Sequence, residues 1–241
     1  MIPKVIHYFW FGGNPLPPVV CKCIESWKRL MPGYEIKRWD ESNFDIDQTP
    51  YMREAYQAKK WAYVSDYARM KVLYEQGGVY LDTDVELIKS LEPILRRGAF
   101  MACERKSNQL PYPGVATGLG IAVEAHHPIY KAVLDYYDSI HFTGASGGLT
   151  VVEHVTSVLI KHGLRPTTEL QEVAGITIYP PEYFCPFDKM NRLSITPETV
   201  AIHHYAGTWI SGPEKIKKKL AKLLGPHITY VIVRIKSYLR K

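Results

Sequence analysis

Cysteine is scarce in this sequence, with four residues in a chain of 241, at Cys21, Cys23, Cys103 and Cys185. Their spacing matches neither a zinc-ligand pattern nor a disulfide framework. Proteins that depend on disulfides belong to oxidising compartments, so this usage favours a reducing one. We therefore expect a cytoplasmic protein, in which Cys21 and Cys23 are packing residues of a helix.

Long apolar runs are also missing. The longest run near the C-terminus, ITYVIV, stops at Arg234 and is much shorter than the ~20 residues that span a bilayer. The N-terminal stretch MIPKVIHYFWFGG is interrupted by Pro3, Lys4 and His7 and has no small-residue cleavage site, so it does not match a signal peptide. We expect a strand there and no membrane-spanning segment.

Positive charge is scarce outside the C-terminal end. The formal net charge is +6, yet nine Lys and Arg residues follow Pro213, against the single acidic residue Glu214. The tail thus carries a net charge of +8 and residues 1–212 carry −2. Because the body lacks the basic surface of a nucleic-acid-binding protein, we expect no nucleic-acid partner.

The remaining pattern is that of one α/β domain. No repeat or Ser/Gly linker divides the chain, and 46% of its residues are apolar, which is enough for a sizeable core. Expected strands cover residues 4–10, 34–39, 79–81, 100–103, 119–123 and 199–203. Expected helices are a segment ending at Leu30 and residues 51–76, 128–139 and 149–162. This alternation predicts a Rossmann-like domain over 1–212, with a mostly parallel central sheet flanked by helices, and then a basic helical tail over 213–241.

Two carboxylates, Asp82 and Asp84, follow the buried strand Val79-Tyr80-Leu81. Ligands of such sheets bind beyond the carboxyl ends of the strands. Where a strand ends and turns, both carboxylates can face one cation, and their oxygens suit Mg²⁺ or Mn²⁺. An ion held there would offset the negative charge of a diphosphate leaving group.

The Asp-x-Asp spacing alone is weak evidence, because Asp45-Ile46-Asp47 repeats it in a polar stretch that we interpret as a solvated loop. The copy after the buried strand differs in having a polar set just upstream, on an otherwise apolar helix. Ser65, Asp66 and Arg69 occupy adjoining parts of one face of that helix. They either face a cleft beside the strand-end aspartates or include a surface ion pair of little energetic effect.

Three segments carry a resemblance to a known family: IPKVIHYFWFGG, WAYVSDYARMKVLYEQGGVYLDTDVELIKSL and HHYAGTWIS. The second is the most specific, because it joins Ser-Asp-x-x-Arg, Gly-Gly-x-Tyr and Asp-x-Asp. With these segments the chain resembles the sugar-transferring proteins grouped as glycosyltransferase family 32, which include bacterial capsular-polysaccharide transferases and yeast-type α-mannosyltransferases. The resemblance implies a GT-A fold, a nucleotide-sugar donor, Mn²⁺ or Mg²⁺, and retention of anomeric configuration.

The resemblance also implies site residues. Asp84 is expected to bind the metal directly and Asp82 to contact both metal and ribose, while Asp66 and Arg69 contact the donor sugar and diphosphate. The expected catalytic residues are Asp66, Arg69, Asp82 and Asp84, and the expected metal ligands are Asp82, Asp84 and His204. The expected donor-binding residues are Trp10, Ser65, Asp66, Arg69, Tyr80, Asp82, His204, Trp209 and Ser211.

Two of these residues have a second interpretation. Trp10 is expected to stack on the nucleotide base, or else is a core tryptophan. His204 is similar to the third metal ligand of related retaining galactosyltransferases, or else is structural, and His203 is expected to point away from it. Trp209 and Ser211 are expected on a loop that closes over the diphosphate and excludes water.

These expectations combine into a metal-dependent retaining hexosyltransferase. It would use a UDP-sugar, or alternatively a GDP-sugar, and a glycan or lipid-linked acceptor in bacterial capsular, exo- or lipopolysaccharide synthesis. Residues 104–198 match the family loosely, so neither the acceptor nor a nucleophile is assigned. Glu124 and Asp135 are available carboxylates, but front-face attack needs none.

Two other classes of protein stay open. LDTDV also resembles the nucleophile loop of an aspartyl phosphohydrolase, although about eighty residues precede it and no Gly-Asp-x-x-x-Asp follows. The other class is a non-catalytic module that binds a nucleotide or a sugar.

The tail combines apolar stripes with its lysines. One stripe comprises Ile216, Leu220, Leu223 and Leu224, and another comprises Ile228, Val231, Ile232, Ile235 and Leu239. Two short basic amphipathic helices fit the anionic inner face of the cell membrane, which would make the protein peripheral there. The alternative is that both helices pack on their own domain.

Overall fold

The computed structural model of the protein describes residues 1–104, 113–144, 150–188, 190 and 192–207. The chain divides into two compact units, Met1–Tyr205 and Ala206–Lys241, and the first carries the fold described here. Trp209, Ser211 and the predicted tail over 213–241 lie outside the described residues. Among the described residues, no helix is both long enough and apolar enough to cross a bilayer.

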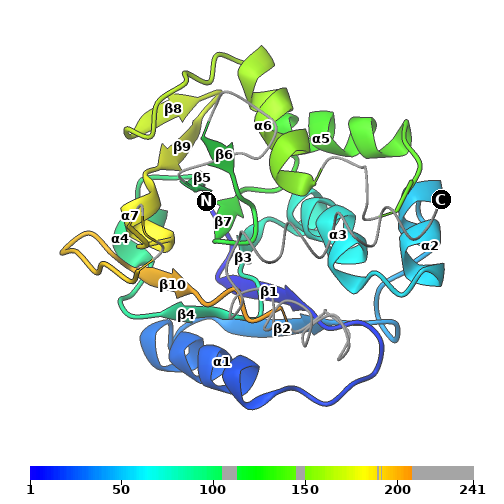
Figure 1. The fold of residues 1–241 in the computed structure, drawn as a ribbon, viewed down its shortest axis with the longest axis horizontal. Helices are drawn as coiled ribbons and strands as arrows, with labels where there is room; N and C mark the ends of the chain where they lie inside the picture. Colours follow the sequence, from blue (N-terminus) through cyan, green and yellow to red (C-terminus); the bar gives the residue numbers. More distant parts are fainter. Residues whose placement is uncertain (105–112, 145–149, 189, 191, 208–241) are drawn as a thin grey trace, which may run out of the picture. The chain divides into compact units, whose positions relative to one another are not determined.

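Strands and helices alternate along the described residues (Figure 1). The strands are β1 (Val5–Phe9), β2 (Glu35–Trp39), β3 (Gly78–Tyr80), β4 (Val85–Leu87), β5 (Phe100–Glu104), β6 (Gly114–Val115), β7 (Ile121–Val123), β8 (Gln171–Val173), β9 (Ile176–Tyr179) and β10 (Ala201–His203). The helices are α1 (Pro18–Leu30), α2 (Pro50–Gln57), α3 (Trp61–Gln76), α4 (Glu92–Leu95), α5 (Pro128–Asp138), α6 (Val151–Lys161) and α7 (Pro181–Phe184). Every element predicted within the described residues has a counterpart, whereas the predicted tail helices lie outside them. The elements without a prediction, β4, β6, β8, β9, α4 and α7, are too short to show a periodic pattern.

The main sheet has the strand order β2-β1-β3-β7-β5-β9-β8, with β6 paired to β5. β1 runs parallel to β2 and β3, and β5 runs parallel to β9. Because β7 is antiparallel to both β3 and β5, the strands β1, β2, β3, β5 and β9 all point the same way. The prediction of a mostly parallel sheet is confirmed, and the carboxyl ends of these strands lie along one edge. β4 and β10 form a separate antiparallel pair.

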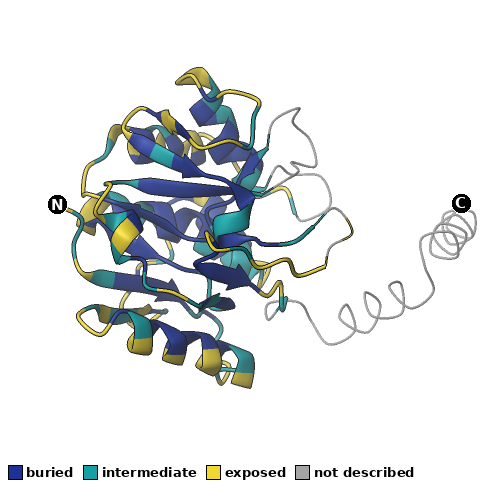
Figure 2. Cartoon of the chain, turned by 90° about the vertical axis from the view of Figure 1, so that its left-hand side faces the viewer, coloured by how far each residue is buried: buried dark blue, intermediate teal, exposed yellow. Residues whose placement is uncertain are grey.

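The sheet separates two hydrophobic cores. Along β1, Ile6 and Tyr8 pack into the core that contains α1, while Phe9 packs into the core that contains α3, α5 and α6. This split follows from the alternation of side chains along a strand. In Figure 2 the strands are buried, while α1 turns an exposed face outward. Cys23 of α1 is buried as predicted, whereas Cys21 lies on the exposed face, so its assignment as a packing residue is wrong.

The predicted helix over residues 51–76 is two helices, α2 and α3. Thr49 caps α2 by accepting a hydrogen bond from the Met52 amide at 3.1 Å. The break comes at Lys59, whose φ of 55° is left-handed, and the Lys60 amide closes the helix end onto the Ala55 carbonyl. A left-handed residue at a helix end is usually glycine. Because this position is a lysine, the sequence gives no sign of the boundary between α2 and α3.

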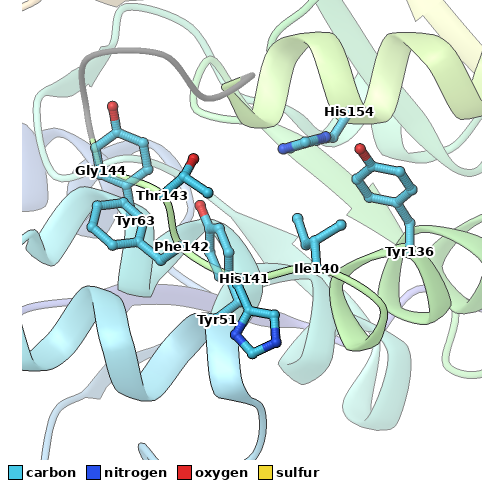
Figure 3. Close-up of a pocket in the computed structure, with 9 residues that line it drawn as sticks. All are labelled: Tyr51, Tyr63, Tyr136, Ile140, His141, Phe142, Thr143, Gly144 and His154. Carbon is cyan, nitrogen blue, oxygen red and sulfur yellow. The ribbon is translucent and has the colours of Figure 1, made fainter.

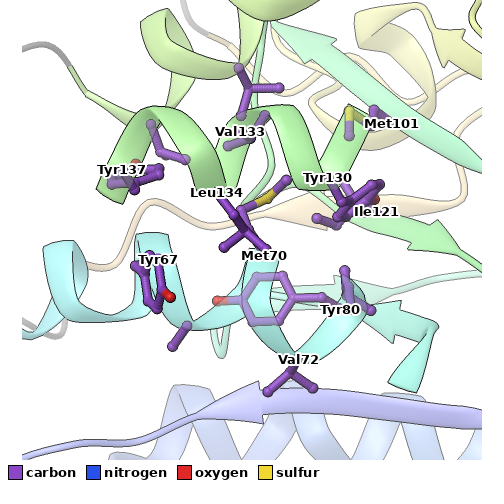
Figure 4. Packing of buried hydrophobic residues seen from close by; sticks show 14 of the residues in the cluster. Tyr67, Met70, Val72, Tyr80, Met101, Ile121, Tyr130, Val133, Leu134 and Tyr137 are labelled. Atoms are coloured by element: carbon purple, nitrogen blue, oxygen red, sulfur yellow. The ribbon is translucent and has the colours of Figure 1, made fainter. Parts of the chain in front are cut away.

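Helix α3 packs between the sheet and α5, as Figure 4 shows through Met70, Tyr80 and Leu134. The predicted inward residues Val64, Ala68 and Leu73 are fully buried. Because α3 is covered on both sides, its polar residues Asp66 and Arg69 are also withdrawn from solvent, at 7% and 4% exposure. The helix therefore carries charged groups into the interior beside the carboxyl end of β3.

A buried histidine ties β1 to β2 and to the end of α3. Trp39 donates its indole N–H to His7 Nδ1 at 3.0 Å, and His7 Nε2 lies 3.0 Å from the Gly77 carbonyl oxygen. These partners require the neutral tautomer with its proton on Nε2. Burial lowers the pKa of His7 to about 4, and the hydrogen bond to Gly77 offsets only part of this effect.

We expect acid to destabilise the fold through His7. The unfolded histidine takes up a proton near its ordinary pKa of 6.5, while the folded one stays neutral until about pH 4. The free energy of unfolding should therefore decrease between these pH values, by about 3 kcal/mol from this residue. Urea unfolding at several pH values checks this, with His7→Gln as the comparison. If the variant and the parent lose stability in parallel across this range, His7 is not the group responsible.

Candidate functional site

Asp82 and Asp84 lie in the turn between β3 and β4, beyond the carboxyl end of β3. The turn is closed by the Val85 amide, which donates to the Asp82 carbonyl oxygen at 3.0 Å. Because this turn replaces regular strand geometry, the two carboxylates need not point to opposite faces. The turn thus brings both carboxylates to the edge of the sheet where ligands of such folds bind.

His203, the last residue of β10, completes a cluster with these aspartates. Its Nε2 atom lies 3.1 Å from Asp84 Oδ1 and 3.9 Å from Asp82 Oδ2. One ligand atom from each of the three residues falls within 4.8 Å of the others. β10 pairs antiparallel with β4 and sets His203 opposite Val85, which fixes its position beside the turn.

His203 occupies the place predicted for His204, and this part of the prediction is corrected. His204 Nε2 instead lies 2.8 Å from Glu86 Oε2, a carboxylate that also pairs with Lys22. The register explains the difference: Ile202 pairs with Glu86, so the alternation of side chains puts His204 on the face of Glu86 and His203 on the opposite face. Sequence alone did not settle which of the two adjacent histidines faces the cluster.

The Asp82 carboxylate is held by Tyr80 and Arg69 and lies against Gly118. Its Oδ1 accepts a hydrogen bond from the Tyr80 hydroxyl at 2.5 Å and lies 3.2 Å from Arg69 NH1. Its Oδ2 lies against Gly118, where a Cβ atom would come within 2.2 Å of that oxygen. The Gly118 carbonyl also accepts the Asp82 amide at 3.2 Å. Tyr80 was predicted to support the site and does contact Asp82, whereas Gly118 escaped the sequence analysis because its function is to leave room.

Arg69 is a buried cation between two carboxylates. NH2 donates to Asp66 Oδ1 at 2.9 Å, Nε donates to the Ser65 carbonyl at 3.0 Å, and NH1 reaches Asp82 and, at 3.4 Å, Thr117. Burial would lower the pKa of Arg69, but the charges of Asp82 and its other neighbours raise it. Burial raises the pKa of Asp66 to about 7, and Arg69 opposes this. Asp66 and Arg69 thus form a buried pair beside Asp82 rather than a surface pair.

His203 is surrounded by negative charge. Burial alone would lower its pKa, but the hydrogen bond to Asp84 and the charges of Asp84, Asp82 and Glu104 raise it. The two aspartates therefore favour the protonated form of His203. The same position would favour a bound cation for the same reason.

Tyr205 connects His203 to Glu104, which ends β5 at the same edge of the sheet. The rings of His203 and Tyr205 lie 4.1 Å apart between centroids, and the Tyr205 hydroxyl donates to Glu104 Oε2 at 3.2 Å. Burial raises the pKa of Glu104 in spite of this hydrogen bond. Glu104 was not among the predicted site residues. It is a carboxylate at the end of a strand, as Asp82 is a carboxylate just after one, and this pattern could have identified it.

Of the other predicted residues, Trp10 lies at the carboxyl edge of the sheet, whereas the Ser65 hydroxyl is bonded within its own helix. Trp10 follows β1 at the carboxyl edge and is half-buried, with its indole N–H donated to the Asn14 carbonyl at 2.6 Å. The Ser65 hydroxyl is bonded to the Trp61 carbonyl of its own helix at 3.0 Å. In Asp45-Ile46-Asp47, the second occurrence of the Asp-x-Asp spacing, Asp47 pairs with Arg53 at an exposed turn. This confirms the interpretation of that segment as a solvated loop.

The residues of this cluster fit a divalent cation. Two carboxylates and one imidazole, all within 4.8 Å, are ligands that suit Mn²⁺ or a related ion. Both aspartates are anchored, Asp82 by Tyr80 and Arg69 and Asp84 by His203. Asp82, Asp84 and His203 are therefore the residues that would hold an ion.

Comparisons with known proteins find similarity to glycosyltransferases. Residues 17–101 match a family described as the glycosyltransferase sugar-binding region containing a DXD motif. The chain is 25% identical over 201 residues to an uncharacterised glycosyltransferase of Acanthamoeba polyphaga mimivirus, covering 79% of this chain and 76% of that protein. It is 35% identical over 104 residues to inositol phosphoceramide mannosyltransferase 3 of Schizosaccharomyces pombe, covering 42% of this chain. That match spans only 29% of the fission-yeast protein.

A solved structure shares the fold. The PaToxG glycosyltransferase superposes with a TM-score of 0.54 at 20% identity, over 66% of this chain and 69% of that one. At this level of identity the likeness concerns the arrangement of strands and helices. It confirms the GT-A fold implied by the sequence resemblance.

A methyl group at Gly118 tests the geometry of the cluster. We expect Gly118→Ala to displace the Asp82 carboxylate, because its Cβ would overlap Oδ2. The affinity for Mn²⁺, measured by calorimetric titration, should fall by about 10- to 100-fold, as is typical when the support of a metal ligand is lost. Gly33→Ala is the matched control, since nothing lies within 4 Å of its Cβ position. Unchanged Mn²⁺ affinity in Gly118→Ala would contradict this description of the site.

Proposed function

Since residues 17–101 match the glycosyltransferase sugar-binding region with a DXD motif and the domain has the GT-A fold, we propose that the protein transfers a sugar from a nucleotide-sugar donor with the help of a divalent metal ion. The observation that supports this most strongly is the approach of Asp82, Asp84 and His203 to within 4.8 Å at the carboxyl edge of the sheet. Mn²⁺, or alternatively Mg²⁺, is the proposed ion.

The residues of the site divide into ligands and supports. Asp84 and His203 are the proposed metal ligands, together with Asp82, which also faces the donor ribose. Tyr80 and Arg69 hold Asp82 from one side, so that only one of its oxygens is committed to them. Arg69 is 4% exposed and already bonded to several acceptors, so we propose that it positions Asp82 and Asp66 instead of contacting the diphosphate itself.

The chemistry follows from the charges. When bound, the ion offsets the negative charge that develops on the diphosphate as it leaves the sugar. We propose that Asp66 accepts hydrogen bonds from donor-sugar hydroxyls and that Trp10 stacks on the nucleotide base. His204 was predicted as donor-binding; its bond to Glu86 favours a structural role instead. Trp209 and Ser211 remain proposals for closing over the diphosphate.

The finer assignments are also proposals. The donor is a UDP-sugar, with a GDP-sugar as the alternative, and the transferred group is a hexose with retained configuration. The acceptor is a glycan or a lipid-linked sugar in bacterial capsular, exo- or lipopolysaccharide synthesis. The fission-yeast relative named as an inositol phosphoceramide mannosyltransferase supports the lipid-linked class.

The two alternatives, an aspartyl phosphohydrolase and a non-catalytic binding module, have less support than the glycosyltransferase. For the aspartyl phosphohydrolase, about eighty residues precede the LDTDV loop and no Gly-Asp-x-x-x-Asp follows it, whereas the domain has the GT-A fold. A non-catalytic binding module would use the same fold, and turnover separates it from an enzyme.

We predict Mn²⁺-dependent release of nucleoside diphosphate from a UDP- or GDP-sugar. Asp84→Asn keeps the shape of the side chain but removes its charge, so the rate should fall about 100-fold or more. A coupled assay for free UDP or GDP measures this. Asp45→Asn, in the solvated copy of the motif, is the control and should retain the parental rate. No release with any donor and ion would leave a binding module as the better description.

The adjacent histidines provide a second test. We expect His203→Ala to lower the affinity for Mn²⁺ more than about tenfold, since it removes a proposed ligand. His204→Ala should leave this affinity unchanged, because His204 faces Glu86. The stabilisation of each variant by Mn²⁺ with UDP in a thermal-shift series gives the comparison. The opposite ranking would return the metal-binding role to His204.

We also propose that the basic tail over 213–241 docks the protein on an anionic membrane, as nine basic residues would favour. Co-sedimentation with phosphatidylserine-containing vesicles should decrease to background on truncation after Ser211. It should also decrease at high salt, because the attraction is screened. Equal sedimentation by the truncated protein would show that the tail is not a membrane anchor.

A further inference from the structure

An aromatic pocket lies between helices α2, α3, α5 and α6, apart from the aspartate cluster. Figure 3 shows two facing walls, with Tyr51, Tyr63 and Phe142 on one side and Tyr136 and His154 on the other. The hollow has a volume of about 170 Å³. None of these five residues belongs to the proposed donor site.

The first wall is an interlocked set of rings. Phe142 meets Tyr63 edge-on at 5.1 Å between centroids and Tyr51 at 5.8 Å. On the second wall Tyr136 lies 4.7 Å from His154. Because each ring is packed against another, the rings have little freedom to rotate, and the pocket is largely formed before any ligand arrives.

The loop that carries Phe142 is fastened to α2. The two carboxylate oxygens of Glu54 accept hydrogen bonds from His141 Nδ1 at 2.7 Å and from the Phe142 amide at 2.8 Å. These bonds lower the pKa of Glu54, so it is ionised at neutral pH. The position of the aromatic wall is therefore set by a charged anchor outside the pocket.

The pocket adjoins the buried ion pair of the proposed donor site. Tyr63 precedes Asp66 by three residues on α3, which makes them neighbours on one face of the helix. Burial raises the pKa values of Tyr51 and Tyr63, and the charge of Asp66 raises them further, so both hydroxyl groups lie within its field. Tyr137, which packs on Tyr51 at 4.9 Å, also interacts with the charge of Arg69.

We propose that this pocket binds one sugar ring of the acceptor. A pyranose ring has apolar C–H faces that suit flat aromatic walls and a polar rim that suits tyrosine, threonine and histidine groups, the mixture typical of small-ligand sites. With about 170 Å³, the hollow is smaller than the roughly 300–1,000 Å³ of pockets for drug-sized ligands, so it suits a single sugar ring and not a whole nucleotide sugar. The assignment of this sugar as acceptor rests on the proposed function.

The experiment uses the full chain and defined probes. Methyl glycosides of glucose, galactose, mannose and N-acetylglucosamine are tested one at a time by saturation-transfer-difference NMR. At least one should bind, and Tyr136→Ala and Phe142→Ala should weaken it roughly two- to tenfold, as expected for the loss of one aromatic contact. Tyr136→Phe keeps the ring and should keep binding. Tyr34→Ala, on a half-buried tyrosine outside the pocket, should have no effect.

Binding of UDP and GDP with Mn²⁺ is measured on the same variants by thermal shift and should be unchanged, which also verifies that they are folded. No binding by any glycoside, or equal binding by Tyr136→Ala and the parent, overturns the pocket assignment and leaves the donor site intact. Glycoside binding that depends on Tyr136, in a protein that binds neither nucleotide, would support the pocket and remove the proposed function. Weaker nucleotide binding in Tyr136→Ala would instead show that the pocket holds the base.

Discussion

The site depends on the ion pairs that the buried guanidinium of Arg69 forms with Asp66 and Asp82. This guanidinium joins α3 to the turn after β3 by pairing with both Asp66 and Asp82. Arg69 and Asp66 are withdrawn from bulk water, while the Asp82 side chain keeps 27% exposure. A charge buried without a partner is very unfavourable, so each member of this set requires the others. Removing one partner of such a pair costs about 3–5 kcal/mol in comparable proteins. The arrangement therefore fixes the Asp82 carboxylate before any ligand binds.

The directions of the strands explain why separate segments meet there. β1, β3 and β5 point the same way, so the residues that follow or end them, Trp10, Asp82 and Glu104, lie along one edge of the sheet. The antiparallel pair β4 and β10 then brings His203 to the turn from the other end of the domain. Among the described residues, His203 is the one that lies with both aspartates within 4.8 Å, so it would add a nitrogen ligand to their oxygens.

Sequence reasoning predicted most of the fold and part of the site. The α/β class, the strands that define the carboxyl edge, and the position of Asp82 and Asp84 at that edge followed from periodicity and motif context. The break at Lys59 was missed because its left-handed backbone lacks the usual glycine. Periodicity could not place His203 rather than His204 beside the aspartates, because that depends on the register between β10 and β4. Gly118 was missed because empty space next to Asp82 leaves no local pattern.

The most direct test is a crystal structure of the protein with Mn²⁺ and UDP, or GDP if only that nucleotide binds, using anomalous scattering to locate the ion. We expect one manganese peak bonded to Asp84 and His203, with the diphosphate oxygens completing its coordination and Arg69 still paired with Asp82. A manganese ion bound at His204 and Glu86, or a nucleotide bound away from the carboxyl edge of the sheet, would contradict it.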